Sequence, residues 1–308
     1  MTSATRSLSL AVCVPTLNAG ALWPEWLARF RAAFGDTPLL VVDSSSSDKT
    51  PDLARQAGAE VVSIERCEFD HGATRDWALR YCEEDIVVFL TQDALPVNTA
   101  SHLALRKAFD QPGVAAAFGR QLPHHNATPI SAHTRLFNYP PTSRVVDASD
   151  IPQLGIKAAF LSNSFTAYRR QALLDVGGFP HGTILSEDMI AGARLLQAGW
   201  QLAYCADAQV LHSHNYSFRE EFRRYFDIGV LHQRERWLVE WLGRAEGEGA
   251  RFVRSEIGYL LRRAYWRLPE AALRTLIKYA GYRLGQQEAR LPLGVKRRCS
   301  MNVRFWES

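Results

Sequence analysis

The 308-residue sequence predicts an α/β protein in which a mostly parallel sheet is flanked by helices and followed by a C-terminal α-helical extension. Apolar, strand-like segments alternate with amphipathic, helix-like segments through the first half of the chain. This alternation is typical of a parallel, doubly wound sheet. The last third of the chain instead carries apolar residues at helical spacing among many arginines.

Four strands and three helices are expected in the first half of the chain. The second of these helices has a well-defined start, because Thr50 and Pro51 match an N-cap followed by proline at the first helical position. Gly58 then marks its end. The expected strands are residues 8–16, 38–43, 59–64 and 85–91, and the expected helices are residues 23–35, 52–57 and 74–84.

The middle of the chain has a less regular pattern. Residues 119–157 contain five prolines and are expected to form a long loop. Residues 158–170 are strand-like, and residues 186–200 predict a helix with an acidic first turn. Residues 201–214 are expected to form two short strands. From Phe218 onward the pattern is helical and amphipathic.

Charge is distributed unevenly along the chain. Residues 216–308 hold 19 Lys/Arg and 11 Asp/Glu, whereas the preceding residues hold 17 and 21. This asymmetry predicts that the C-terminal region meets an anionic partner, either a membrane surface or nucleic acid. Nucleic acid is not expected, because no recognised binding motif accompanies the charge. The five cysteines lack a CxxC pair and no apolar run is long enough for a transmembrane helix, which favours a cytosolic protein.

Polar residues follow three of the predicted strands. Ligands of an open parallel sheet bind beyond the carboxyl ends of its strands. Asn18, Asp43 and Asp93, which follow the first, second and fourth strands, should therefore face one crevice. No GxGxxG follows the first strand and no P-loop is present, which argues against a dinucleotide dehydrogenase and a P-loop nucleotidase.

Several residues near this crevice have both a chemical and a structural interpretation. Asp43 suits the imide N–H of a pyrimidine, but also an Asx turn before the serines. Asp93 suits Mg²⁺ or Mn²⁺ with phosphate completing the shell, or a simple strand cap. His71, Gly72 and Arg75 stand at a helix entry, where backbone N–H groups and a guanidinium suit phosphate or sugar hydroxyls. A glycine turn with a solvated arginine explains them equally well.

Two further pairs stand later in the chain. His212 and His214 are two residues apart, so an extended segment points both to one face, where one could be a metal ligand. Structural histidines fit the pattern as well. Glu187 and Asp188 begin a predicted helix, where the helix dipole favours acids. Their chemical interpretation is a general base that takes a proton from an acceptor hydroxyl.

The ordered set of motifs resembles family 2 glycosyltransferases of the GT-A fold, which is Rossmann-like, and is most similar to the bacterial rhamnosyltransferase branch. The resemblance covers roughly residues 8–230. It rests on VPTLNAG, VVDSSSSDKT, FDHGATRDWA, TQDALP, LSNSFTAYRR, SEDM and VLHSHNYS in that order. The departure is Thr91, where the fuller DxD-type metal motif has its first acid.

The resemblance implies a role for each matching residue. Asp188 is then the catalytic base, with Glu187 beside it. A divalent cation, Mg²⁺ or Mn²⁺, is implied at Asp93, His212 and His214, with substrate phosphate compensating for Thr91. The residues implied to bind the nucleotide-sugar are Pro15, Thr16, Asn18, Asp43, Gly72, Arg75, Gln92 and Asp93.

The resemblance also implies a function and a division of the chain. The expected reaction is inverting transfer of L-rhamnose from dTDP-L-rhamnose to a glycan or polyprenyl-linked acceptor in cell-surface polysaccharide or lipopolysaccharide synthesis. Residues 1–217 would form the catalytic domain, with a nucleotide-sugar half at about 1–118 and an acceptor half at about 119–217. Residues 218–308 would form a basic helical region.

The apolar stripe within residues 252–268, flanked by arginines, fits either a membrane surface or a helix packed on the body. The first interpretation predicts a cytoplasmic enzyme, peripheral on the inner face of the cytoplasmic membrane. The alternatives are use of a UDP- or GDP-sugar, a sugar nucleotidyltransferase, and a degenerate GT-A protein that binds glycan without catalysis. A nucleotidyltransferase would need a glycine- and basic-rich loop after the first strand, where this chain has PTLNAG. The degenerate protein is disfavoured by the intact Asp93, Glu187, Asp188, His212 and His214.

Overall fold

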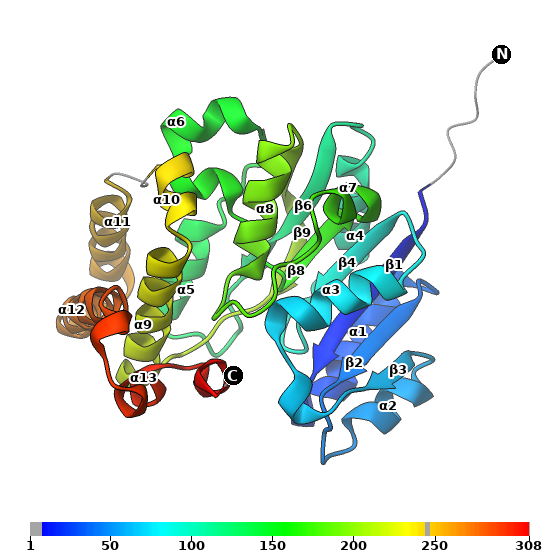
Figure 1. Cartoon of the computed structure of the whole chain (residues 1–308), viewed down its shortest axis with the longest axis horizontal. Coiled ribbons are helices and arrows are strands. Elements are labelled where there is room, and N and C mark those ends of the chain that lie inside the picture. Colours follow the sequence, from blue (N-terminus) through cyan, green and yellow to red (C-terminus); the bar gives the residue numbers. More distant parts are fainter. Residues whose placement is uncertain (1–7, 244–246, 308) are drawn as a thin grey trace.

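The computed structural model describes residues 8–243 and 247–307, and their strands form one sheet with helices on both faces (Figure 1). The strand order is β3-β2-β1-β4-β8-β6-β9-β5, with β7 paired to β9. The strands are β1 (Leu10–Thr16), β2 (Leu39–Asp43), β3 (Glu60–Ser63), β4 (Ile86–Leu90), β5 (Leu95–Pro96), β6 (Val114–Leu122), β7 (Arg144–Val146), β8 (Phe165–Arg169) and β9 (Gln201–Leu211).

Helices α1 to α8 lie between these strands in the sequence, and the helices after β9 form the C-terminal region. They are α1 (Trp23–Phe34), α2 (Thr50–Gln56), α3 (His71–Tyr81), α4 (Ala100–Ala108), α5 (Pro129–Asn138), α6 (Ile151–Leu154), α7 (Arg170–Asp175), α8 (Glu187–Gln197), α9 (Phe218–Arg234), α10 (Arg236–Leu242), α11 (Glu248–Arg263), α12 (Leu268–Gly285) and α13 (Leu293–Cys299). Short 3-10 turns include η4 (Gly155–Ala159), η5 (Tyr265–Arg267) and η7 (Val303–Trp306).

The α/β class is confirmed, and the seven elements expected in the first half are present within three residues of their predicted ends. The sheet is parallel from β3 through β4. Beyond β4 it is mixed, because β8 runs antiparallel to both β4 and β6. The strands β4, β6 and β9 therefore all run in the same direction and end at the same edge of the sheet.

Two expectations for the middle of the chain are wrong. Residues 119–157 are not a long loop: they contain the end of β6, helices α5 and α6, and strand β7. Proline misled the prediction, because Pro129 and Pro152 occupy first-turn positions that helices tolerate. Residues 201–214 contain one long strand, β9, instead of two short ones.

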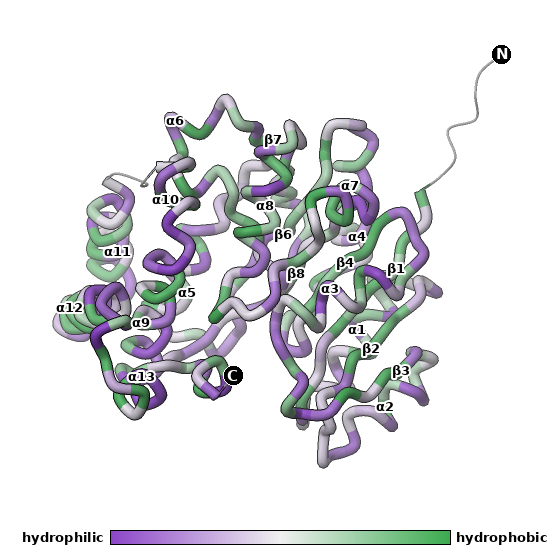
Figure 2. Tube along the Cα trace, in the orientation of Figure 1, coloured by the Kyte–Doolittle hydropathy of each residue, from purple (hydrophilic) through white to green (hydrophobic). Residues whose placement is uncertain are grey.

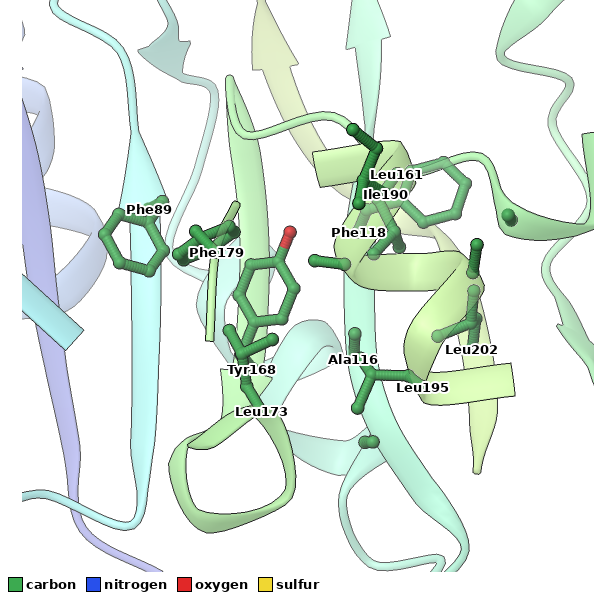
Figure 3. Packing of buried hydrophobic residues seen from close by; sticks show 14 of the residues in the cluster. Phe89, Ala116, Phe118, Leu161, Tyr168, Leu173, Phe179, Ile190, Leu195 and Leu202 are labelled. Carbon is green, nitrogen blue, oxygen red and sulfur yellow. The ribbon is translucent and has the colours of Figure 1, made fainter. Parts of the chain in front are cut away.

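The core divides into two clusters, one on each face of the sheet. Alternation along β4 is clear: Val87 and Phe89 join one cluster, while Ile86, Val88 and Leu90 join the other. The first cluster packs under α8, where Phe89, Tyr168 and Phe179 meet edge to face (Figure 3). The second packs against α1, whose inward stripe is Trp23, Trp26, Phe30 and Phe34.

The C-terminal helices are continuous with this core. Phe226 and Val230 of α9 and Leu238 of α10 are buried in the first cluster. Helix α12 packs closely on α9, because Gly281 lies against the Phe222 carbonyl and a Cβ there would approach it to 2.4 Å. The helix expected within 252–268 is α11, whose Leu260 and the adjoining Ala264 pack on α5 instead of facing solvent. The interpretation as a helix packed on the body is therefore correct for this part of the stripe.

Candidate active site

A cavity of about 610 Å³ opens at the edge of the sheet where β4, β6 and β9 end. The body and the C-terminal helices both contribute to its walls. Residues after β4, β6 and β9 line the bottom, and α5 and the start of α8 form one side. Helices α9 and α12 close the other side. The acidic, basic and histidine residues of the lining are His71, Asp93, Arg135, Asp188, His212, His214, Glu221, Arg224, Arg267, Glu270, Arg274 and Lys278, and Gln121 lines the cavity with them.

Asp93, His212 and His214 form a cluster in this cavity. One ligand atom from each lies within 4.8 Å of the others. His212 Nε2 is 3.4 Å from Asp93 Oδ2, and His214 Nε2 is 3.8 Å from the same oxygen. Two imidazoles and one carboxylate suit divalent transition metals. The three residues predicted as metal ligands are therefore brought together.

The hydrogen bonds behind His212 orient it for a cation. Gln121 Nε2 donates to Ser162 Oγ at 2.8 Å, and Arg135 Nη1 donates to Gln121 Oε1 at 2.7 Å. Gln121 Oε1 is therefore an acceptor, and its 2.8 Å contact with His212 Nδ1 requires a proton on Nδ1. The Nε2 lone pair of a neutral His212 then faces Asp93. Two acceptors facing each other need a cation between them, and supporting contacts of this kind are usual around metal ligands.

The charges of the cluster agree with this geometry. Burial lowers the pKa of His212 and holds the imidazole in its neutral form. Burial also lowers the pKa of His214, to about 4. Burial raises the pKa of Asp93, but the facing His212 and Thr91 side chains outweigh it and hold the pKa below its ordinary value. The donor set therefore fits a divalent cation.

Asp188 lies in the first turn of α8 and faces the cavity, whereas Glu187 is buried behind it. The Asn163 backbone N–H donates to Asp188 Oδ2 at 2.9 Å, and the Met189 N–H donates to Oδ1 at 2.8 Å. Burial and the adjacent Glu187 carboxylate raise the pKa of Asp188 to about 7. Asp188 is therefore a stronger base than a solvated carboxylate.

Glu187 has partners of its own. Arg75 Nη1 lies 3.1 Å from Glu187 Oε1, with both side chains less than 10% exposed. Asn163 Nδ2 donates to the same oxygen at 3.0 Å. Burial raises the pKa of Glu187, but Arg75, His71 and Asn163 outweigh it and keep the pKa below its ordinary value. Glu187 is thus the permanently charged member of the pair, and its charge keeps Asp188 basic.

Arg75 and Gly72 of α3 therefore contact protein groups in this structure. Arg75 pairs with Glu187 and donates to the His71 carbonyl at 3.0 Å. Gly72 lies against the Pro180 carbonyl, and a Cβ would come within 1.7 Å of that oxygen. Both residues hold the segment that leads into α8. Their predicted diphosphate contact stays a prediction.

Four of the residues predicted for the nucleotide-sugar, Pro15, Thr16, Asn18 and Asp43, lie at the ends of β1 and β2, outside the lining of the cavity. Thr16 is in register with Asp43, and its hydroxyl donates to Asp43 Oδ1 at 2.8 Å. Ser46 donates to both oxygens of Asp43, through its hydroxyl at 2.6 Å and its backbone N–H at 2.8 Å. These bonds match the Asx-turn interpretation, and a carboxylate retains acceptor capacity beyond them.

Asn18 and Gln92 connect the loops at this edge. Asn18, at φ 46°, accepts the Ser47 N–H on Oδ1 at 2.8 Å. Gln92 pairs with the backbone of Leu17 in both directions, accepting at 2.8 Å and donating at 3.1 Å. Pro15 precedes Thr16 in β1. The side-chain amide of Gln92 thus connects the loop after β4 to the loop after β1.

The residues of the site that the sequence prediction missed include Gln121, Arg135, Asn163 and Arg224. Gln121 and Arg135 fall in the segment expected to be a loop. Asn163 stands in the LSNS motif without an assigned role. Arg224 is one of many arginines in the C-terminal region, and only the fold brings it to the cavity.

Comparisons with known proteins identify a family and close relatives in sequence. Residues 8–239 match the family described as "Glycosyltransferase like family 2". The chain is 46% identical over 303 residues to the O-antigen chain rhamnosyltransferase WbaN of Salmonella anatum, covering 97% of this chain and 96% of that protein. It is 44% identical over 304 residues to RfbN of Salmonella typhimurium, named as the same activity, covering 98% and 97%.

Solved structures share the fold. A mannosyltransferase from Pyrobaculum calidifontis, in complex with GDP-Man and Mn²⁺, aligns with a TM-score of 0.59 at 21% identity and covers 98% of this chain and 86% of that one. TarS residues 1–349 of S. aureus, in complex with UDP-GlcNAc, aligns with a TM-score of 0.53 at 17% identity and covers 92% of each chain. These similarities establish a GT-A fold for this chain.

Proposed function

The chain belongs to glycosyltransferase family 2, and we propose that it transfers L-rhamnose from dTDP-L-rhamnose to a growing bacterial cell-surface glycan with inversion at the anomeric carbon. The observation that carries this proposal is one cavity lined by both a basic carboxylate, Asp188, and a cation-binding cluster, Asp93 with His212 and His214. A transfer from a nucleotide-sugar needs both, since the attacking hydroxyl loses a proton and the leaving diphosphate gains charge. The choice of rhamnose rests on the named activity of two relatives that match nearly the whole chain.

Asp188 acts on the acceptor. Its carboxylate takes the proton of the acceptor hydroxyl as that oxygen attacks the anomeric carbon from the side opposite the phosphate. The new C–O bond forms while the bond to the diphosphate oxygen breaks, through an oxocarbenium-like transition state. One displacement inverts the configuration. The backbone N–H groups of Asn163 and Met189 hold both carboxylate oxygens, and Glu187 sustains their basicity.

Asp93, His212 and His214 would hold the divalent cation, Mg²⁺ or Mn²⁺. When bound, that ion neutralises the negative charge that develops on the leaving nucleoside diphosphate. Gln121 orients His212 toward the site. Substrate phosphate would supply the further oxygen ligands that Thr91 does not.

The loops after β1 and β2 are proposed to hold the nucleotide. Asp43, buried beneath Thr16 and Ser46, presents its remaining acceptor capacity to the pyrimidine imide. Pro15, in β1, and Asn18, in the loop after β1, are proposed to line the same nucleotide pocket. The nucleotide-sugar half at about 1–118 would thus face the acceptor half at about 119–217, and residues 218–308 would close the cavity through α9 and α12.

The acceptor is proposed to be a polyprenyl-linked glycan, with the enzyme peripheral on the inner face of the cytoplasmic membrane. Every helix within residues 8–243 and 247–307 is too short or too polar to span a bilayer. Exposed apolar residues nevertheless gather on α11, η5 and α12, where hydrophobic and hydrophilic segments alternate at the left edge of Figure 2. They are Ile257, Leu261, Tyr265, Trp266, Leu273, Leu276 and Tyr279. Aromatic and aliphatic side chains among arginines suit an anionic lipid surface.

A thermal-shift panel tests the donor. The purified chain is heated with dTDP-L-rhamnose, UDP-sugars and GDP-sugars, each with Mn²⁺, with Mg²⁺ and with EDTA. We expect the largest rise in melting temperature with dTDP-L-rhamnose and a divalent cation, because ligand that binds only the native state stabilises it. A clear preference for a UDP- or GDP-sugar would redirect the donor assignment. If the chain binds nucleotide-sugar but releases no nucleoside diphosphate with any lipid-linked acceptor, the result would support the alternative of a degenerate glycan-binding protein.

A further inference from the structure

The cavity contains more cationic side chains than its acids neutralise. Five cationic side chains line it: Arg135, Arg224, Arg267, Arg274 and Lys278. The last three, on η5 and α12, are paired with acids that line the same cavity. Arg274 contacts Glu221 and Glu270 at 2.7 and 2.9 Å, Lys278 contacts Glu221 at 3.1 Å, and Arg267 contacts Glu270 at 2.7 Å.

Arg135 and Arg224 have no such partner among the described residues. Arg135, on α5, spends one N–H on Gln121 Oε1, the oxygen that also accepts from His212. Arg224, on α9, is exposed to the cavity and no carboxylate of the described chain lies within ion-pair distance of it. Two guanidinium groups from different helices therefore face one cavity, neither of them in an ion pair with a carboxylate of the described residues.

The position of this pair relates it to the reaction centre. Arg135 donates to Gln121 Oε1, the oxygen that also accepts from His212 Nδ1, so Arg135 lies one side chain away from the cation-binding cluster. Arg224 lines the same cavity as Asp93, His212 and His214. A diphosphate bound at the cluster would therefore share one cavity with both guanidinium groups.

We propose that Arg135 and Arg224 form the anion-binding pair of this cavity and receive the diphosphate of the nucleotide-sugar. This assignment rests on the proposed function. Guanidinium groups bind phosphate oxygens in a bidentate fork, which fits the task better than a point charge does. When the bond from the anomeric carbon to phosphate breaks, the electron pair stays on the diphosphate, and the pair stabilises that added charge. The C-terminal helix α9 thereby contributes directly to donor binding.

Calorimetric titration of nucleotides tests the pair. Wild type, Arg135→Gln and Arg224→Gln are titrated with dTDP and with dTMP, in Mn²⁺ and in EDTA. Losing charge-assisted bonds to the terminal phosphate should weaken dTDP binding by about 10- to 100-fold while changing dTMP binding much less. For Arg224→Gln the loss of dTDP affinity should persist in EDTA, because the proposed contact of Arg224 is with phosphate and not with Asp93, His212 or His214. Arg219→Gln, on the exposed side of the same helix, is the matched control and should leave both affinities unchanged.

The outcomes separate this inference from the proposed function. No dTDP binding to wild type, with UDP or GDP bound instead, would overturn the donor assignment, and the pair would then be tested with that diphosphate. Unchanged dTDP affinity in a folded Arg224→Gln would overturn the pair. Farnesyl diphosphate supplies the other source of a diphosphate, the lipid-linked acceptor. Loss of farnesyl diphosphate binding with dTDP binding intact would assign the arginines to the acceptor and contradict the donor contact.

Discussion

Replacing Asp188 with asparagine tests two effects of this carboxylate, its role as the catalytic base and its effect on the pH dependence of stability. The folded-state pKa of Asp188 is about 7, above the ordinary 3.8, because of burial and the Glu187 charge. The native state therefore binds the proton more tightly than the unfolded state, so the contribution of Asp188 to stability is fully present below about pH 4 and is lost as the pH rises to about 7. The full effect of one proton is about 1.4 kcal/mol per pH unit, and water in the cavity reduces it. We expect a loss of roughly 1–2 kcal/mol between pH 5 and pH 7 in the wild type.

Asp188→Asn removes this dependence. It also loses one acceptor for the Asn163 or Met189 N–H, a pH-independent cost of about 1–3 kcal/mol. The melting temperature of the variant relative to wild type should therefore rise by a few degrees from pH 5 to pH 7, whatever its absolute value. Transfer should fall by about 10²–10⁴-fold with dTDP binding intact. In the wild type the rate should rise with pH and level off above about 7.

Differential scanning fluorimetry across pH, calorimetric dTDP titration and a dTDP-release assay measure the three quantities. Asp93→Asn, a carboxylate in the same cavity whose pKa is lowered, controls for removing a charge. A difference in melting temperature that stays constant with pH would refute the raised pKa. Retained turnover in Asp188→Asn would refute the base assignment.

Three further changes test other parts of the structure. Asp93→Ala should weaken donor binding about 10- to 100-fold in Mn²⁺ but not in EDTA, and equal affinities by calorimetry in Mn²⁺ would count against the cation site. Arg75→Gln leaves the buried Glu187 without its ion-pair partner and should lower the free energy of unfolding, measured with denaturant, by about 3–5 kcal/mol. Adding Glu187→Gln should recover part of this loss of stability, and no recovery would argue against the ion pair. Gly281→Ala should destabilise by about 1–3 kcal/mol through its contact with α9. The control Gly258→Ala, in open space on α11, should stabilise by up to about 1 kcal/mol, and equal effects would contradict the close packing.

The sheet and the location of the site follow from local patterns. Strands that alternate with helices predict parallel pairing, and parallel strands bring their carboxyl ends to one edge. Asp93 could therefore be placed with Asn18 and Asp43 from the strand pattern, and the family resemblance added His212 and His214. Asp188 could be placed at a helix start by its first-turn position.

The electrostatics of the site could not be predicted in this way. The high pKa of Asp188 depends on its burial beside Glu187, and the low pKa of Glu187 depends on Arg75, about 110 positions earlier in the chain. Gln121 and Arg135 were missed because prolines made their segment look like a loop. These features are long-range contacts, which periodicity and turn residues do not record.

The stereochemistry of the product tests the central claim most directly. The chain is incubated with dTDP-L-rhamnose, a divalent cation and a lipid-linked glycan extract, and NMR then gives the anomeric configuration of the new linkage. A single displacement assisted by Asp188 predicts a linkage of opposite configuration to the donor, formed by wild type and absent with Asp188→Asn. A linkage with the donor's own configuration would contradict the account, because retention requires two displacements and a nucleophile.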